Sequence, residues 1–332
     1  MFDLITIGRS NMDLFSSDIG ADFVDITGFL PQVGGSPTNI AIGTARLGLK
    51  SAALTAVGND NVGDFIINYL EKDGVDVSLI KRKPGLSSLA VLGVQPPDKF
   101  PLLFYRENPP DIWLDIDDLP DFGQTKSFLV SGTALARGTC ADAAFFGAEV
   151  AQQAGKLVWM DIDLRPDQWS HPMACGTALR RIIPMVDVVF GTEEEFWAVI
   201  NTDPAKWHGN EAVTDNERAQ VEAWVRETYL ADGSPDTIVL KRGSKGVTIF
   251  DRTDGELDVP GFPVEILNTV GAGDAFASGL IFARTQGKSW FDSGRFANAC
   301  GAIVVTKHGC GDAMPTLEEV TQFMVDYAKT GG

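Results

Sequence analysis

Residues 268–276 read Asn-Thr-Val-Gly-Ala-Gly-Asp-Ala-Phe and are the most informative stretch of the chain. Gly271, Ala272 and Gly273 leave backbone N–H groups uncovered, and the apolar pattern that follows predicts a helix that begins at about Gly271. Free N–H groups at a helix N-terminus attract anions, since the helix dipole places partial positive charge there. Asp274 falls in the first turn, where a carboxylate can accept a proton from an attacking hydroxyl. The stretch predicts an anion hole with a general base, although a capping aspartate would have the same spacing.

Outward from this helix, short β-rich runs alternate with amphipathic helical stretches. The predicted strands are 4–7, 51–57, 127–130, 156–161, 186–190, 237–240 and 247–250, and the predicted helices between them are 38–47, 62–72, 141–154, 193–199 and 216–229. Three further helices are predicted at 271–286, 290–307 and 317–328, with little strand signal after residue 250. Alternation of this kind predicts an α/β fold with a mostly parallel sheet and helices on both faces.

Two regions interrupt the alternation, at about 9–35 and 86–115. Both are rich in Gly, Pro and aromatic residues and lack helical periodicity. Residues 89–94 and 102–105 are typical of a hairpin joined by a turn at Pro96-Pro97-Asp98. We expect one domain over 1–332 with these regions forming a small β lid; two long surface loops are the alternative.

Composition excludes several classes of protein. The chain has 332 residues, 44% of them hydrophobic, and a net charge of −18, which should repel nucleic acid and anionic membranes. The four cysteines form no CxxC pair and there are only three histidines, so a zinc site is not expected. No apolar run approaches the roughly 20 residues of a membrane span. We expect a cytoplasmic protein that binds neither nucleic acid nor membrane.

Other nucleotide-binding motifs are absent from the sequence. No stretch matches GxxxxGK[ST], which argues against a P-loop ATPase, and the protein-kinase motifs are also missing. A dinucleotide-binding fold would have GxGxxG after the first strand, but residues 8–12 read Gly-Arg-Ser-Asn-Met. A dehydrogenase is therefore disfavoured.

Polar residues near the N-terminus are suited to a polyol ligand. Gly34 and Gly35 allow close approach of backbone, and Asn39 can both donate and accept hydrogen bonds. Asp13 follows the first strand, at the sheet edge where α/β folds bind ligands. A turn or capping aspartate is the alternative for Asp13.

Two of these stretches together resemble a known family. Residues 268–279 look like the C-terminal signature of the ribokinase-like (PfkB) carbohydrate kinases, and residues 34–41, continuing to 48, resemble the N-terminal signature. The resemblance covers essentially the whole chain. It implies a three-layer α/β/α domain with a β lid and ATP-dependent phosphoryl transfer, with Asp13 binding substrate hydroxyls.

The same resemblance suggests where the nucleotide binds. Residues 241–246, which include Lys241, Gly243, Ser244 and Gly246, resemble the family's ATP-binding turn, and Asn298 matches a position lining the adenine pocket. Without that context, the turn would be an ordinary basic hairpin loop.

Magnesium and monovalent cation sites are implied less directly. Thr192 stands where these kinases usually have Asn, and Glu195 or Glu194 matches the glutamate that holds Mg²⁺-bound phosphates through water. An exposed acidic helix start is the alternative. Many relatives use a monovalent cation, but Asn268 replaces the usual Asp near the loop around 308–311, so potassium dependence is an open expectation.

Three arginines favour an acidic sugar substrate. Arg165 follows a predicted strand, Arg106 lies on the lid hairpin, and Arg9 follows the first strand. A sugar acid needs a cation, and the forked guanidinium suits a carboxylate. Structural salt bridges, for Arg106 with Glu107 or Asp111, are the alternative.

The segments around these arginines look most like the branch that phosphorylates the terminal hydroxyl of 5-dehydro-2-deoxygluconate in inositol catabolism. The 2-dehydro-3-deoxygluconate kinases, then fructokinases, are the alternatives, as is a catalytically silent sugar- or nucleotide-binding regulator. Lid pairing in relatives implies a homodimer, with residues 89–94 as a candidate edge strand.

Overall fold

The computed structural model describes residues 1–96, 99–231, 233 and 235–329. The strands of its main sheet are β1 (Leu4–Ile7), β4 (Ser51–Leu54), β9 (Ser127–Ser131), β10 (Leu157–Asp161), β11 (Val188–Thr192), β12 (Thr237–Lys241), β13 (Val247–Asp251) and β14 (Gly255–Val259). Within the described residues they form an eight-stranded sheet in the order β14-β13-β12-β11-β10-β9-β1-β4. Six neighbouring strands of this sheet are parallel: β4, β1, β9, β10, β11 and β12. Strands β13 and β14 extend the sheet beyond β12 with antiparallel pairing. The predicted α/β fold is confirmed.

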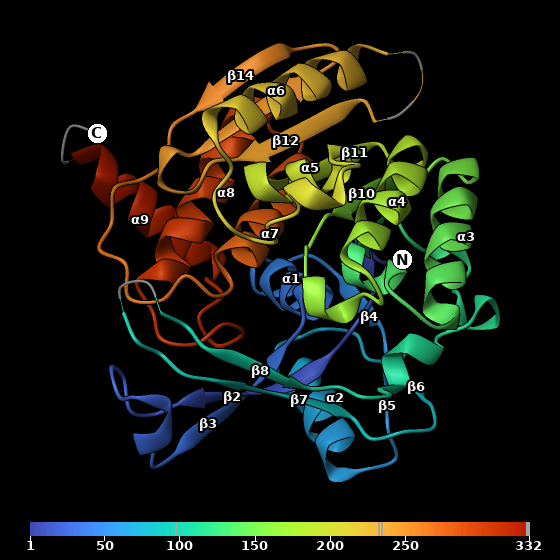
Figure 1. The fold of residues 1–332 in the computed structure, drawn as a ribbon, viewed down its shortest axis with the longest axis vertical. Coiled ribbons are helices and arrows are strands. Elements are labelled where there is room, and N and C mark those ends of the chain that lie inside the picture. Colours follow the sequence, from blue (N-terminus) through green and yellow to red (C-terminus); the bar gives the residue numbers. More distant parts are fainter. Residues whose placement is uncertain (97–98, 232, 234, 330–332) are drawn as a thin grey trace.

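Helices cover both faces of this sheet (Figure 1). The first core includes residues of α1 (Ser36–Arg46), α2 (Asn61–Lys72), α7 (Ala272–Thr285), α8 (Trp290–Val305) and α9 (Leu317–Lys329), and the second those of α3 (Thr139–Gln153), α4 (Pro172–Ile182), α5 (Glu193–Ile200) and α6 (Asp215–Leu230). Leu129 of β9 belongs to the first core, and its neighbours Phe128 and Val130 belong to the second. The central strands are mostly apolar, as expected for strands with both faces buried.

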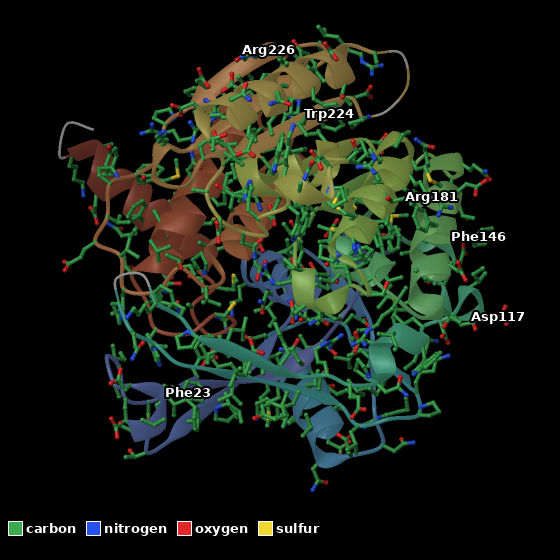
Figure 2. All side chains as sticks on the ribbon, in the orientation of Figure 1. Phe23, Asp117, Phe146, Arg181, Trp224 and Arg226 are labelled. Atoms are coloured by element: carbon green, nitrogen blue, oxygen red, sulfur yellow. The ribbon has the colours of Figure 1, made fainter. Side chains whose placement is uncertain are left out.

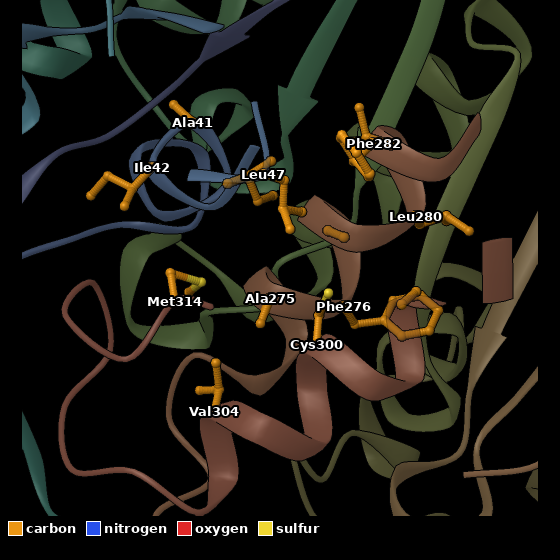
Figure 3. Packing of buried hydrophobic residues seen from close by; sticks show 14 of the residues in the cluster. Ala41, Ile42, Leu47, Ala275, Phe276, Leu280, Phe282, Cys300, Val304 and Met314 are labelled. Carbon is orange, nitrogen blue, oxygen red and sulfur yellow. The ribbon is translucent and has the colours of Figure 1, made fainter. Parts of the chain in front are cut away.

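The first core brings α1, α7 and α8 together although they are far apart in sequence (Figure 3). Ser278 of α7 donates a hydrogen bond to the Ile40 carbonyl of α1 at 3.3 Å, and Cys300 of α8 lies beside Ala275 of α7. A Cβ on Gly279 would lie 2.7 Å from the Cys300 sulfur, so only glycine allows this approach of α7 and α8. This packing holds the N-terminal ends of α1 and α7 next to each other.

A second sheet forms the lid. It contains β2 (Asn11–Ser16), β3 (Phe29–Gly34), β7 (Ser88–Leu92) and β8 (Leu102–Tyr105) in the order β3-β2-β7-β8, and it lies across the lower part of the molecule in Figure 1. A two-stranded ribbon, β5 (Ala56–Val57) with β6 (Lys81–Arg82), lies beside it. Strands β7 and β8 are antiparallel, as the predicted hairpin requires. Of the predicted turn, Pro97 and Asp98 lie outside the described residues.

Three expectations about elements are corrected. Residues 89–94 are not an edge strand, because β7 pairs with β2 on one side and β8 on the other. Helix α4 was not expected, although Pro172 at its first position and the His171 cap are helix-start signals. Strand β14 was also not expected, because it has only five residues, two of them acidic. Helix α6 lies alongside it, and Arg226 of α6 (Figure 2) pairs with Glu256 of β14 at 2.9 Å.

Candidate active site

A cavity lies between the carboxyl ends of the parallel strands and the lid. This is where open α/β sheets place their ligands, because loops diverge from that edge. Residues from the lid, the strand ends and the α7 N-terminus all contribute polar groups to it. They include Arg9, Asn11, Asp13, Gly35, Ser36, Asn39, Asp161, Asp163, Arg165, Glu195, Lys241, Gly271, Gly273, Asp274 and Cys310.

The N-terminus of α7 opens onto this cavity. Gly271 caps the helix in the left-handed conformation, with φ 86°, and α7 begins at Ala272. A Cβ on Gly271 would lie 2.6 Å from the Cys310 sulfur, so the loop can pass here only with glycine. Gly271 and Gly273 line the cavity, and the helix has no side-chain cap, whereas the Ala272 amide donates to the Thr269 carbonyl at 3.3 Å. Backbone N–H groups at such a helix start are suited to phosphate oxygens, as an anion hole requires.

Asp274 lies in the first turn of α7, beside these amides. Its Oδ2 accepts a hydrogen bond from Asn39 Nδ2 at 2.7 Å and lies 3.9 Å from the Cys310 sulfur. Burial raises the pKa of Asp274 to about 6, the negative charge of Asp163 raises it too, and the Asn39 hydrogen bond offsets part of that rise. A carboxylate with a pKa close to neutral is well suited to accept a proton.

Residues expected to bind a polyol line the same cavity, among them Asp13, Gly35 and Asn39. Asn39 Oδ1 is buried and has no hydrogen-bond partner among the residues described, so a ligand hydroxyl can donate to it. Asp13 of β2 accepts a hydrogen bond from Asn11, and burial raises its pKa to about 7. Gly34 faces the Asp13 carboxylate so closely that any Cβ would overlap it. Gly35 lines the cavity beside them.

Two arginines line the cavity. Arg9 is only 5% exposed and lies over the Phe104 ring at 5.1 Å, and its Nη1 donates a long hydrogen bond of 3.4 Å to Asn11 Oδ1. Arg9 Nε has no partner in the part of the chain that the structure describes. Arg165 Nη2 lies 3.2 Å from Asp163 Oδ1, and its side chain is 37% exposed.

Arg106 does not fulfil the predicted role. It is not among the described residues that line the cavity. Its guanidinium donates to both carboxylate oxygens of Asp111, at 3.2 and 2.8 Å, and also to Ser88 and Gln168. All of these groups are buried, so Arg106 is a structural ion pair that anchors β8.

The predicted nucleotide-binding residues divide into two groups. Lys241, the last residue of β12, lines the cavity. Gly243, Ser244 and Gly246 lie in the turn between β12 and β13, outside the described cavity lining. Asn298 of α8 is also outside that lining, and its Nδ2 donates to the carbonyls of Val259 and Pro260 at 3.2 and 3.0 Å.

The glutamates at the start of α5 have distinct environments. Glu195 lines the cavity, and its carboxylate accepts hydrogen bonds from the amides of Thr192 and Leu164, at 2.7 and 3.1 Å. Glu193 instead pairs with Arg218 and Arg242, and Glu194 is not among the described lining residues. The described residues hold no cluster of three His, Cys, Asp or Glu suited to a metal.

Two site residues were not expected from the sequence. Asp161 ends β10 in the cavity, accepts a hydrogen bond from Ser36, and has a pKa raised by burial to about 8. Its position at a strand's carboxyl end was a usable signal. Cys310 accepts a hydrogen bond from Asn39 Nδ2 at 3.0 Å, and its amide donates to Gln32 of lid strand β3 at 2.9 Å. No local pattern distinguishes this cysteine from the others.

Comparison with known proteins identifies the family of the chain. Residues 1–317 match the pfkB family of carbohydrate kinases. The chain belongs to this family. Among curated relatives, 5-dehydro-2-deoxygluconokinase of Geobacillus thermodenitrificans is 33% identical over 326 residues, covering 97% of this chain and 93% of the relative. The enzyme of that name from Bacillus cereus is 33% identical over 331 residues, covering 97% and 95%.

Solved pfkB-like structures have the same fold. A fructokinase from Vibrio cholerae, bound to fructose, ADP and calcium, superposes with a TM-score of 0.80 at 26% identity and covers 97% of this chain and 99% of that one. A putative ribokinase II from E. coli in complex with ATP and Mg²⁺ has a TM-score of 0.82 at 23% identity, covering 98% and 100%. This pfkB member is thus an ATP-dependent sugar kinase. No helix in the described residues is long and apolar enough to cross a membrane.

Proposed function

We propose that this kinase phosphorylates the terminal hydroxyl of 5-dehydro-2-deoxygluconate, a keto-deoxy sugar acid of inositol catabolism. The observation that carries the proposal is Arg9, a buried guanidinium in the cavity with an unpartnered Nε and no ion pair within 4.0 Å in the described residues. A buried cation is costly without an anionic partner. A substrate carboxylate would supply that partner, and Arg165 lies in the same cavity. The names of the curated relatives support the same substrate.

The proposed mechanism uses groups already in place. Asp13, Gly34, Gly35 and Asn39 bind the sugar hydroxyls, which directs the terminal hydroxyl toward Asp274. Asp274 accepts the proton of that hydroxyl as its oxygen attacks the γ-phosphorus. The amides of Gly271–Gly273 stabilise the negative charge that builds on the phosphoryl oxygens. Closure of the lid would exclude water and so limit hydrolysis of ATP.

The nucleotide part of the proposal follows the family resemblance. ATP would bind along the β12–β13 turn, with Gly243, Ser244 and Gly246 near its phosphates and Asn298 near adenine. Mg²⁺ would neutralise phosphate charge, and Glu195, rather than Glu194, would bind its water ligands because only Glu195 lines the cavity among the described residues.

A requirement for a monovalent cation has weaker support than a requirement for Mg²⁺. Asn268 Nδ2 donates to the Gly309 carbonyl at 3.0 Å, so a neutral side chain positions the loop where relatives use an acid. We expect less than a twofold difference in rate between sodium, potassium and tetramethylammonium at equal ionic strength. A tenfold potassium effect would contradict this expectation and restore the cation to the mechanism.

We also propose a cytoplasmic homodimer that forms through the lid. The lid's edge strands are β3 and β8, and they present the exposed side chains of Leu30 (49%) and Tyr105 (64%). Light scattering should give twice the mass of the chain, and Tyr105→Lys should lower it toward that of one chain.

The substrate is tested by a coupled ADP-release assay with Mg·ATP. The panel contains 5-dehydro-2-deoxygluconate, 2-dehydro-3-deoxygluconate, fructose and ribose. We expect the first to have the highest kcat/KM, and Asp274→Asn to lower its kcat by about 10²- to 10⁴-fold. Asp254→Asn, an exposed aspartate in a turn, is the matched control. A neutral sugar as best substrate would overturn the role of Arg9, and 2-dehydro-3-deoxygluconate as best substrate would change the branch.

A further inference from the structure

We propose that Lys241 is a further catalytic residue, whose ammonium group contacts the γ-phosphoryl group of ATP as it is transferred. The inference deepens the proposed function, because it assumes that transfer takes place beside Asp274. It differs from a general role in the ATP-binding turn, since it assigns Lys241 to the reacting phosphate and not to the rest of the nucleotide.

The position of Lys241 supports this assignment. It is the last residue of β12 and pairs with Thr192 of β11, so its side chain leaves the sheet at the carboxyl edge. The side chain is only 13% exposed and lines the cavity. The other residues of the β12–β13 turn are outside that lining in the described part of the chain.

The ammonium group faces the anion hole. A Cβ built on Gly273 would lie 3.5 Å from Lys241 Nζ, and in the described part of the chain it would meet no other atom within 4 Å apart from its own helix backbone and its sequence neighbours. The glycine therefore leaves a gap that separates the lysine from the first turn of α7. A phosphoryl group bound to the amides of Gly271–Gly273 would lie next to this ammonium group and to Asp274.

Lys241 has two neighbouring carboxylates, but neither is close enough to accept a hydrogen bond from its ammonium N–H groups. Nζ lies 3.5 Å from Glu195 Oε2 and 3.9 Å from Asp161 Oδ1. Both distances exceed the roughly 2.7–2.9 Å of a charge-assisted hydrogen bond. The carboxylates already accept closer hydrogen bonds, Glu195 from the Thr192 and Leu164 amides and Asp161 from Ser36.

These neighbours keep the lysine charged. Burial lowers the pKa of Lys241, but the charge of Glu195, with smaller contributions from Asp161, Asp274 and Asp163, outweighs burial and holds the pKa above its ordinary value. Two carboxylates on one side of the ammonium group also restrict where it can move. The arrangement leaves a charged group with free N–H donors directed at the place where phosphate charge develops.

The chemistry of the transfer requires such a charge. The terminal sugar oxygen forms a bond to the γ-phosphorus, and the bond from that phosphorus to the β–γ bridging oxygen breaks. The hydroxyl proton passes to Asp274, and the electron pair of the broken bond leaves on ADP. Negative charge is spread over the phosphoryl oxygens in between, where a desolvated ammonium group stabilises it more than in the ground state.

A purely structural role predicts different behaviour. If Lys241 only neutralised Glu195 and Asp161, its removal would lower stability and would weaken ATP and ADP binding alike. If it contacts the γ-phosphoryl group, ADP binding should be retained. The comparison of the two nucleotides therefore separates the two roles.

The experiment compares Lys241→Met with wild type and with Lys288→Gln, an exposed lysine after α7. Calorimetry with Mg²⁺ measures the Kd of ADP and of the β,γ-imido analogue of ATP. We expect the analogue to bind at least tenfold more weakly to Lys241→Met and ADP to bind within twofold of wild type. With the sugar acid, kcat should fall by about 10²- to 10³-fold with little change in its KM. Equal weakening of both nucleotides, or kcat within threefold of wild type, would overturn the proposal.

If Lys241→Met does not fold, as shown by the absence of a cooperative melting transition, Lys241→Arg provides the test instead. It retains the positive charge beside both carboxylates but replaces a point charge by a planar fork. We expect kcat to fall at least tenfold with ADP affinity unchanged, and a rate within twofold of wild type would refute the assignment. The nucleotide binding measurements contain no sugar. If no sugar acid is phosphorylated, the substrate proposal fails while the Lys241 result still stands.

Discussion

Asn39 Nδ2 donates a hydrogen bond of 2.7 Å to Asp274 Oδ2, although 235 positions separate the two residues in the chain. Asn39 belongs to α1 and Asp274 to α7, and the two helices are packed together in the first core. One amide thus links the residue proposed to bind the sugar with the residue proposed to deprotonate it. The same Nδ2 also donates to the Cys310 sulfur at 3.0 Å.

The pH dependence of kcat should report this hydrogen bond. Because ionised Asp274 is the active form, kcat should fall as pH decreases through an apparent pKa of about 6. The Asn39 hydrogen bond stabilises the ionised form, so Asn39→Leu should move this limb to higher pH. Rates at saturating sugar and ATP from pH 5 to 9 measure it, with Asn216→Leu, an exposed residue of α6, as control. An unchanged limb in Asn39→Leu would show that Asp274 is not the titrating base.

Stability should depend on pH through Asp13. Burial raises the Asp13 pKa to about 7 in the folded protein, above the value of about 3.9 in an unfolded chain. The folded state therefore binds more protons between these values, so stability is lost as pH rises from about 4 through 7. Asp13→Asn remains neutral and should not undergo this loss. Melting temperatures should place Asp13→Asn further above wild type at pH 8 than at pH 5. A gap that narrows with rising pH would contradict the assignment.

The two buried arginines of the lid region should respond differently to the same substitution. Arg9→Gln should raise KM for the sugar acid by about 10- to 100-fold, because it removes a charged hydrogen-bond donor from the carboxylate, and should leave KM for ATP unchanged. Arg106→Gln should instead lower the free energy of unfolding by about 3–5 kcal/mol, because Asp111 would remain buried without its partner. Steady-state kinetics measures the two KM values of each variant, and urea unfolding measures its free energy of unfolding. If Arg106→Gln alone raised KM and stability were normal, the two assignments would be exchanged.

The sequence identifies Arg9, Arg106 and Arg165 as candidates for binding a substrate carboxylate. It does not show which of them bind substrate and which form structural ion pairs. Each of the three has acidic residues nearby, so local sequence favours a salt bridge as much as a ligand site. Arg106 is occupied by Ser88 and Gln168, which are 18 and 62 residues away, as well as by Asp111. Such partners depend on how the lid folds over the strand ends. Non-local packing of this kind has no short-range pattern.

The fold was easier to predict from the sequence than the roles of the arginines, for a physical reason. Strands buried on both faces are continuous apolar runs, and amphipathic helices have a clear period, so both signals are local. The start of α7 is also local, since small residues before an apolar helical pattern suffice to predict it. Cys310 is the opposite case. Its contact with Asn39 spans 271 positions, and only the folded structure shows that a thiol borders Asp274, the proposed base.

The two glycines that flank α7 provide the sharpest test of the anion hole. Gly271 and Gly287 both have positive φ, 86° and 75°, so alanine at either position should cost about 1 kcal/mol of backbone strain. A Cβ at Gly287 meets no atom within 4 Å, whereas one at Gly271 would lie 2.6 Å from the Cys310 sulfur. Relieving that contact requires Cys310 to move, and Cys310 contacts both Asn39 and Asp274. We expect similar losses of stability, but a fall in kcat of at least tenfold in Gly271→Ala only. Adding Cys310→Ala to Gly271→Ala removes the obstructing sulfur and should restore part of the rate. Equal rates in the two single variants, or no recovery in the double variant, would show that the Gly271–Cys310 contact does not set the geometry of the anion hole.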